Sequence, residues 1–217
     1  MKINDLFRTL DQPSAESLFK EKGSKFLGYA YPVGSQEEVE DILQSQKKSH
    51  PKARHWCYAW QIGVENPVFR YNDDGEPNNS AGKPIFGQIQ SFDLTNVLVV
   101  VVRYFGGTKL GVGGLVTAYR SAAKMALDNA VIVERMLMEK VALQFEYVHM
   151  DKVMRIIKEN DLDIIKQTME LDCLFEISVR KNNLGPVLEL FENLRCIKIE
   201  QVKQTVHKSG PAGTEGP

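Results

Sequence analysis

The chain has 217 residues, a net charge of −1 and 43% hydrophobic residues, values typical of one large or two small globular domains. Because the net charge is close to zero, general polyanion binding is excluded and any anion site must be local. Cys57, Cys173 and Cys196 are scattered along the chain, which favours a reducing compartment over disulfides or a zinc site. The longest apolar run, 97–102, is too short for a membrane span, and no signal-peptide pattern follows Met1. We therefore expect a cytoplasmic protein.

The first part of the chain mixes strand and helix patterns. Two strands are expected within residues 15–33, on either side of a turn at Gly23. Ser35 begins a helix, because residues 35–38 fit the capping-box pattern. The further expected elements are a strand over 54–62, its hairpin partner over 66–70, a turn over 73–79, a helix over 80–89, a strand over 96–103 and, after a glycine-rich loop, a helix ending near 130.

The pattern changes after residue 134. Strands are expected over 140–147, 162–169, 171–180 and 196–202, with helices over 150–159 and 184–194. This β-α-β-β-α-β order is that of a ferredoxin-like domain. We therefore predict an α+β chain with domains over 1–135 and 136–206. Residues 207–217 are rich in Gly and Pro, and we expect a disordered tail there.

Residues 94–127 contain no Asp or Glu. A β-branched strand, a glycine-rich loop and a helix follow one another there, an order that brings backbone N–H groups to face an anion. The cations of this region are Arg103, Lys109, Arg120 and Lys124. The glycines of interest are Gly106, Gly107, Gly111, Gly113 and Gly114. Alternatively, these glycines only permit a tight turn and close packing of helix on sheet.

Two nucleotide-binding motifs are not satisfied by this loop. Gly106 and Gly111 have Walker A spacing, but Val112 and Gly113 stand where Lys and Ser/Thr are required. A dinucleotide fingerprint fails because Val116 occupies its third glycine position. The motifs therefore indicate neither a nucleoside triphosphate nor NAD.

Three other groups allow a functional and a structural interpretation. His55 and Cys57 share one face of a strand, but at about 7 Å apart they fit a half-buried histidine and an inert core cysteine better than a nucleophilic pair. Asp73, Asp74 and Glu76 either hold Mg²⁺ or form a solvated turn. The basic residues within 47–54 either contact phosphate or form the solvated end of a helix.

Four segments, taken in order, resemble the YigZ/IMPACT family, and the resemblance extends over residues 15–130. They are RHWCYAW at 54–60, DDGEP at 73–77, SAGKP at 80–84 and RYFGGTKLGVGGLV at 103–116. The resemblance implies an N-terminal domain of the ribosomal-protein and elongation-factor type, with a left-handed βαβ unit. It implies a ferredoxin-like C-terminal domain similar to modules of elongation factor G. Eukaryotic IMPACT proteins are translational regulators, whereas bacterial members have no settled activity.

The resemblance and the residues together support a non-enzymatic, translation-associated regulator. Its partner is expected to be RNA, the ribosome or a translation factor, without DNA specificity, membrane contact or a cofactor. We assign no catalytic residue, no definite metal and no oligomeric state. The candidate anion surface adds Lys83 to the cations and glycines named above, and His55, Asp73, Asp74 and Glu76 form a candidate metal or polar surface. Asn78 and Asn79 depart from the small residues common in relatives, which weakens any transfer of a backbone contact at that loop.

Two alternatives use different chemistry. An enzyme or nucleotide sensor would bind a phosphorylated small molecule at the same glycine loop. A protein-interaction regulator would bind a polypeptide partner instead of RNA.

Overall fold

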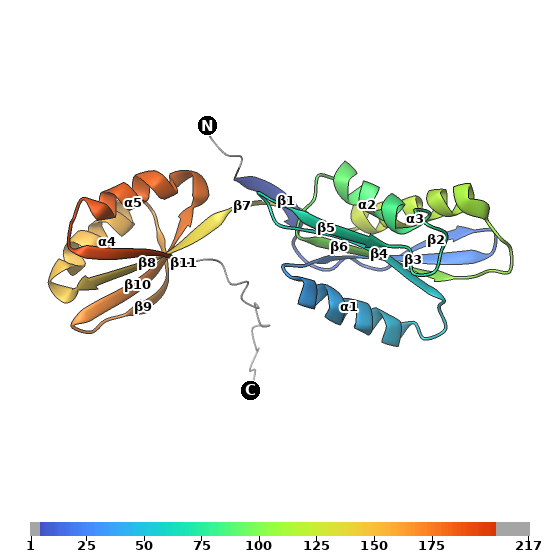
Figure 1. Cartoon of the computed structure of the whole chain (residues 1–217), viewed down its shortest axis with the longest axis horizontal. Helices are drawn as coiled ribbons and strands as arrows, with labels where there is room; N and C mark the ends of the chain where they lie inside the picture. The colour runs from blue at the N-terminus through green and yellow to red at the C-terminus, as the bar shows by residue number, and fades with distance from the viewer. Residues whose placement is uncertain (1–4, 203–217) are drawn as a thin grey trace. The chain divides into compact units, whose positions relative to one another are not determined.

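The computed structural model describes residues 5–202, and its side chains through residue 200. The described residues form two compact units, one spanning Leu6–Arg135 and the other joining Asp5 to the chain from Met136 onward. Both units combine β-sheet and helices, so the chain is a two-domain α+β protein (Figure 1). Within residues 5–202, no helix has both the length and the apolar character needed to cross a membrane.

The first unit contains a five-stranded antiparallel sheet. Its strand order is β2-β3-β6-β4-β5. These strands are β2 (Ser17–Glu21), β3 (Ser24–Pro32), β6 (Val97–Tyr104), β4 (His55–Ile62) and β5 (Val68–Asn72). Because β3 and β4 both pair with β6 in antiparallel fashion, they run parallel to each other, joined by the crossover helix α1 (Gln36–Ser49). The left hand of this crossover stays a prediction.

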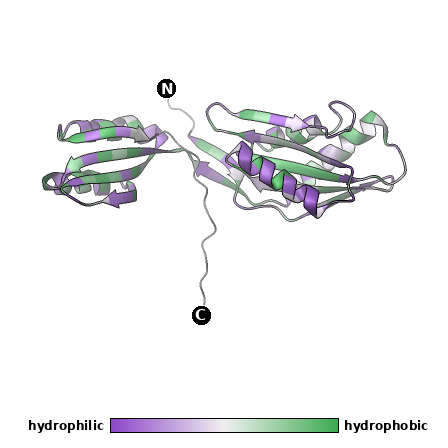
Figure 2. Cartoon of the chain, turned by 60° about the horizontal axis from the view of Figure 1, so that its bottom comes forward, coloured by the Kyte–Doolittle hydropathy of each residue, from purple (hydrophilic) through white to green (hydrophobic). Residues whose placement is uncertain are grey.

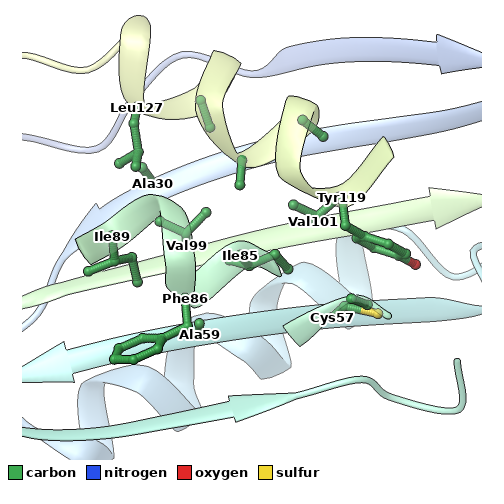
Figure 3. Packing of buried hydrophobic residues seen from close by; sticks show 14 of the residues in the cluster. Ala30, Cys57, Ala59, Ile85, Phe86, Ile89, Val99, Val101, Tyr119 and Leu127 are labelled. Carbon is green, nitrogen blue, oxygen red and sulfur yellow. The ribbon is translucent and has the colours of Figure 1, made fainter. Parts of the chain in front are cut away.

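Helices cover both faces of this sheet. α2 (Gly82–Ser91) and α3 (Gly111–Asp128) lie on one face and α1 lies on the other (Figure 1). This double cover explains why β6 is apolar from Val97 to Val102: Val99 and Val101 face α2 and α3, while Val100 and Val102 face the α1 side. Figure 3 shows the larger core, where side chains from both helices meet those of the strands.

α1 begins after Ser35 as the capping pattern predicts, although Glu38 binds the N–H of the residue before the cap. The Ser35 hydroxyl accepts a hydrogen bond from the Glu38 N–H at 3.3 Å, and the Glu38 carboxylate accepts one from the Gly34 N–H at 2.8 Å. Figure 2 shows a largely hydrophilic helix with narrow apolar bands, and the buried Val39 lies in the core on that side of the sheet. One apolar stripe therefore holds α1 on the sheet.

Two strands lie outside the expected elements. β1 (Leu6–Leu10) and β7 (Ile132–Met136) pair with each other as a separate two-stranded sheet. The Asp11 N–H also donates to the Val131 carbonyl at 3.0 Å. This ribbon brings the beginning and the end of the first unit together.

The second unit has the expected ferredoxin-like topology. Its sheet order is β11-β8-β10-β9, with every neighbouring pair antiparallel. The elements are β8 (Met138–Glu146), α4 (Met150–Glu159), β9 (Asp163–Thr168), β10 (Asp172–Arg180), α5 (Leu184–Glu192) and β11 (Ile197–Val202), with short 3₁₀ turns η1 (Tyr147–His149) and η2 (Lys181–Asn183). The expected tail at 207–217 lies outside the described residues.

Alternate residues of this sheet form the core of the second unit. Phe145 and Phe175 pack edge to face within that core, with ring centroids 5.2 Å apart. Both rings are buried, so neither has a face free for a ligand. Tyr147, just beyond β8, is by contrast exposed.

Candidate functional site

The glycine loop lies at the surface of the first unit. Residues 105–109 are exposed between the end of β6 and the start of α3. Leu110 is the N-cap residue of α3 and provides no side-chain cap, and the first turn of the helix carries no acidic residue. The first N–H groups of α3 are therefore without a side-chain acceptor, and the positive end of the helix dipole is not neutralised locally.

The positions of the loop differ in why they hold glycine. A Cβ on Gly106 would lie 1.9 Å from the Gly23 carbonyl carbon, so this glycine allows the loop to pack on the β2–β3 turn. Gly107 and Gly111 have φ angles of +89° and +72°, which favour glycine. Gly114 packs against Leu110, because a Cβ added to Gly114 would lie 3.0 Å from the Cβ of Leu110. Gly113 has neither a positive φ nor any neighbour within 4 Å of an added Cβ, so the fold itself does not require glycine there.

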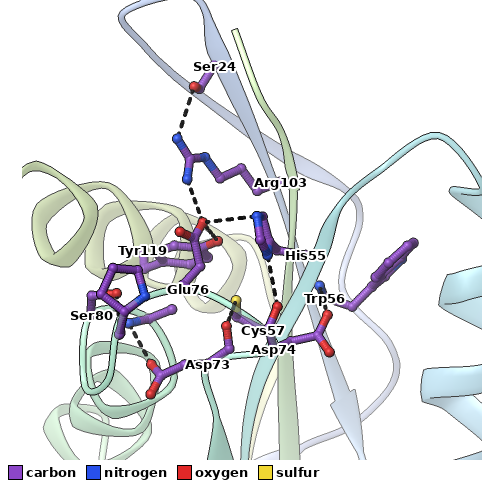
Figure 4. Close-up of polar contacts among 12 residues, drawn as sticks. Ser24, His55, Trp56, Cys57, Asp73, Asp74, Glu76, Ser80, Arg103 and Tyr119 are labelled. Atoms are coloured by element: carbon purple, nitrogen blue, oxygen red, sulfur yellow. Dashed lines mark hydrogen bonds and ion pairs between the residues drawn. The ribbon is translucent and has the colours of Figure 1, made fainter. Parts of the chain in front are cut away.

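Arg103 does not lie on the rim of the loop. It is 5% exposed, and its Nη1 donates to Glu76 Oε1 at 2.5 Å (Figure 4). The guanidinium lies over the rings of Phe26 and Phe105, 5.4 and 5.5 Å from their centroids. The expectation of a free rim cation therefore does not fit its surroundings, because its charge is already paired inside the protein.

Glu76 is the centre of a buried polar cluster beneath the loop. Its Oε1 also accepts a hydrogen bond from the Tyr119 hydroxyl at 2.8 Å, and His55 Nε2 lies 4.0 Å away. Ser24 joins the cluster from β3, where its hydroxyl accepts from the Gly106 N–H at 3.2 Å. These contacts fasten the 73–80 loop, the glycine loop and the β2–β3 turn to one another.

The aspartates of the 73–80 loop bind backbone groups. Asp73 Oδ1 accepts from the N–H groups of Ala81 and Gly82 at 2.9 and 2.8 Å, and Oδ2 accepts from Asn79 N–H at 2.8 Å. Asp73 therefore caps α2 from outside the helix. Asp74 Oδ2 accepts from the Trp56 N–H at 2.7 Å.

The histidine and cysteine of β4 also have structural partners. His55 Nδ1 lies 2.8 Å from the Asp74 carbonyl oxygen, so Nδ1 carries the hydrogen in the neutral ring. The Cys57 thiol donates to the Asp73 carbonyl at 3.0 Å. Burial raises the pKa of the Cys57 thiol, which opposes a thiolate nucleophile. Among residues 5–202, no three His, Cys, Asp or Glu side chains are arranged to hold a metal ion.

The remaining candidate cations occupy separate places. Lys109 is exposed on the glycine loop. Lys124 pairs with Asp128 at 2.7 Å on the outer face of α3. Lys83 and Arg120 line a groove of about 740 Å³. The structure therefore distributes the expected basic rim over several surfaces and leaves Lys109 as the exposed cation of the loop.

The basic end of α1 lies on the opposite face of the sheet. His50 joins two tyrosines there, with Nε2 2.8 Å from the Tyr29 hydroxyl and Nδ1 2.9 Å from the Tyr104 hydroxyl. Lys47 lies over the Trp56 ring, 5.8 Å from its centroid. These contacts give the basic run a packing role on the α1 side.

Sequence reasoning missed one residue of this site and an aromatic pair on a separate surface. Tyr119 is not among the predicted site residues, although its hydroxyl reaches Glu76 and burial raises its pKa. The aromatic pair Phe69 and Phe86, which stacks with centroids 4.4 Å apart, was not considered at all. An apolar edge strand followed by an apolar helix was the available signal for that pair.

The fold and the site define a two-domain α+β protein with a surface glycine loop held over a buried Glu–Arg–Tyr cluster. The Impact N-terminal domain matches residues 22–127. The Escherichia coli protein IMPACT family member YigZ is 31% identical over 160 residues, which cover 73% of this chain and 78% of that protein. The chain belongs to the IMPACT family.

Two further comparisons agree with this assignment. The Bacillus subtilis IMPACT family member YvyE is 35% identical over 137 residues, 63% of each chain. A crystal structure described as a hypothetical protein is similar with a TM-score of 0.70 and 25% identity, covering 93% of this chain and all of that one. The similarity to that structure therefore extends over both units.

Proposed function

We propose that this protein is a translation-associated regulator that acts by binding, and that its glycine loop contacts RNA phosphate groups on the ribosome. Membership of the IMPACT family supports the first part, because the family resemblance implies translational regulators among the eukaryotic members. We place this function in the cytoplasm, which agrees with the free cysteines at positions 57, 173 and 196.

Gly113 carries the second part of the proposal. The fold permits a side chain at this position, yet the residue is glycine and lies in the uncapped first turn of α3. Glycine is commonly used where a ligand approaches the backbone closely. Free N–H groups at a helix N-terminus bind phosphate oxygens directly.

Lys109 supplies the charge beside these N–H groups. Glu21, which lines a hollow of about 250 Å³ with Gly113 and Gly114, would repel an anion on the β2 side of the helix. We therefore place the phosphate on the loop side, next to Lys109. Because the loop has few cations, the salt dependence of binding should be moderate. Loss of one phosphate contact should reduce the slope of log K against log salt concentration by about 1.

Co-sedimentation with ribosomes from the same organism, at low and at high salt, tests this proposal. We expect salt-sensitive pelleting of the wild-type protein and its loss in Lys109→Glu. Lys152→Glu, an exposed lysine on α4, is the matched control for charge reversal and should pellet like the wild type. Equal pelleting of all three proteins, or none at low salt, would refute the proposal.

A thermal-shift panel of nucleotides with Mg²⁺ addresses the enzyme or nucleotide-sensor alternative. Ligand at 100 times its Kd would stabilise the protein by about 2.7 kcal/mol. We expect no such stabilisation, and a clear one that Lys109→Glu abolishes would favour a small phosphorylated ligand over RNA.

A further inference from the structure

A second surface of the first unit has the features of a peptide-binding site. β5 is the last strand of the sheet order, paired with β4 on one side. Val68 and Phe69 are 55% and 54% exposed on it, and Tyr71 is 36% exposed. Edge strands usually avoid exposed apolar residues, because an open edge pairs readily with other chains. β5 is short and carries the exposed Arg70, and both features limit such pairing.

The groove beside β5 has an aromatic floor. Phe69 and Tyr71 both stack on Phe86 of α2, with centroid distances of 4.4 and 6.0 Å. Val116 of α3 and Pro84 complete the apolar lining of this 740 Å³ groove. The volume falls within the range of ordinary ligand pockets, about 300–1,000 Å³.

The charge at this groove has one sign. Lys83 and Arg120 are its charged lining residues, and no Asp or Glu lines it. Both side chains are exposed, and the amides of Asn79, Gln88 and Gln90 supply further polar groups on its walls. An occupant that complements this surface combines apolar side chains with carboxylates.

We propose that β5 and this groove bind an extended peptide segment of alternating apolar and acidic side chains, which adds a strand to the sheet. Main-chain hydrogen bonds to β5 would supply affinity, and alternate side chains would enter the groove. Carboxylates of the peptide would pair with Lys83 and Arg120. This surface is separate from the glycine loop, so the inference does not depend on RNA binding there.

Two other occupants fit the surface less well. A second copy of this chain, added through antiparallel pairing of two β5 strands centred on Arg70, would place two arginines opposite each other, which is unfavourable. A single RNA strand would find two cations lining the groove, and the backbone groups of an edge strand would stay unpaired. A peptide can satisfy those groups.

Selection of a random dodecapeptide phage library on the full chain tests the proposal without assuming a sequence. We expect enrichment of peptides that alternate apolar residues with Asp or Glu. Fluorescence anisotropy of the synthesised peptide should then show at least tenfold weaker binding to Lys83→Glu/Arg120→Glu. Lys152→Glu/Lys158→Glu, two exposed lysines of α4, is the matched control and should bind like the wild type.

Two further measurements separate strand addition from simple apolar contact. N-methylation of alternate peptide backbone nitrogens should abolish binding in one register and leave it intact in the other. A peptide with its acidic residues changed to Lys should prefer Lys83→Glu/Arg120→Glu to the wild type. Phe69→Ser should weaken binding at least tenfold without a change in the circular dichroism spectrum.

Several results would overturn the proposal. These are failure to enrich peptides, equal binding to the groove variant and its control, and equal tolerance of both N-methylation registers. A labelled oligouridine that binds more tightly than the peptide, and that Phe69→Ser releases, would assign the groove to RNA. A dimer in sedimentation equilibrium that Phe69→Ser dissociates would assign it to a second copy of the chain. Lys109→Glu should leave peptide binding unchanged, which distinguishes failure here from failure at the glycine loop.

Discussion

At the scale of single residues, Glu76 and Arg103 form an ion pair in which both side chains are almost fully buried. Glu76→Gln would leave the guanidinium without a counter-charge, and breaking a buried pair in this way typically costs about 3–5 kcal/mol. Urea denaturation followed by tryptophan fluorescence measures this loss selectively, because Trp56 and Trp60 both lie in β4 of the first unit.

The exposed pair of Lys124 and Asp128 is the control for this prediction. Lys124→Ala should change the free energy of unfolding by less than about 1 kcal/mol, because solvent screens such pairs. If Glu76→Gln were as mild as Lys124→Ala, the buried cluster would not be what holds the two loops together.

Two glycines of the loop should respond in opposite ways to alanine. Gly106→Ala places a Cβ inside the backbone of the β2–β3 turn, so we expect strong destabilisation in the same urea assay. Gly113→Ala meets open space on a helix, where alanine is favoured over glycine by about 1 kcal/mol. A destabilised Gly113→Ala would mean that the fold, and not a ligand, requires this glycine.

At the scale of elements, the start of α2 depends on a residue outside the helix. Asp73→Ala removes acceptors from three backbone N–H groups, and we expect a loss of about 2 kcal/mol, at the upper end for a helix cap. Asp73→Asn retains a carbonyl oxygen at this position and should lose less. Urea denaturation by tryptophan fluorescence compares the two, and equal losses would contradict a capping role.

Most regular elements were predictable because their sequences follow the pattern of their burial. β8, for example, buries Val141, Leu143 and Phe145 in alternation, which the sequence pattern indicates directly. β1 and β7 were not predictable, because their burial does not alternate and each pairs with a strand at the far end of the unit. Short strands whose partner is distant leave no local signal.

Most residues of the site were predictable from the sequence, but their roles were not. Arg103 and Glu76 both belong to the motifs that indicate the family, yet their pairing depends on how the 73–80 loop folds over β4. The sequence therefore suggested a free cation and a separate acidic cluster, whereas the two charges neutralise each other. The groove at β5 escaped notice because Phe69 and Phe86 meet only in the folded sheet.

At the scale of the whole molecule, the two units offer separate readouts of stability. Asp5 belongs to the second unit, where its carboxylate accepts hydrogen bonds from Arg180 at 2.7 and 2.9 Å. The hydrogen bond from Arg180 holds the pKa of Asp5 below its ordinary value of 3.8. The stabilisation is therefore complete above about pH 4 and is lost as the pH falls further and Asp5 is protonated.

Asp5→Asn should remove this part of the pH dependence. NMR amide signals of β8 and β10, recorded in urea between pH 2 and pH 6, report the second unit alone. We expect the wild-type unit to lose stability in acid more steeply than Asp5→Asn does. Identical acid profiles would show that other carboxylates determine the acid stability of this unit.

We propose that the glycine loop is open because a phosphate group approaches it. The most direct test is ribosome co-sedimentation of Gly113→Ala at low salt, with its urea stability measured in parallel. We expect stability equal to or above that of the wild type, together with about tenfold weaker pelleting, equivalent to about 1.4 kcal/mol. Wild-type pelleting by a fully stable Gly113→Ala would contradict it.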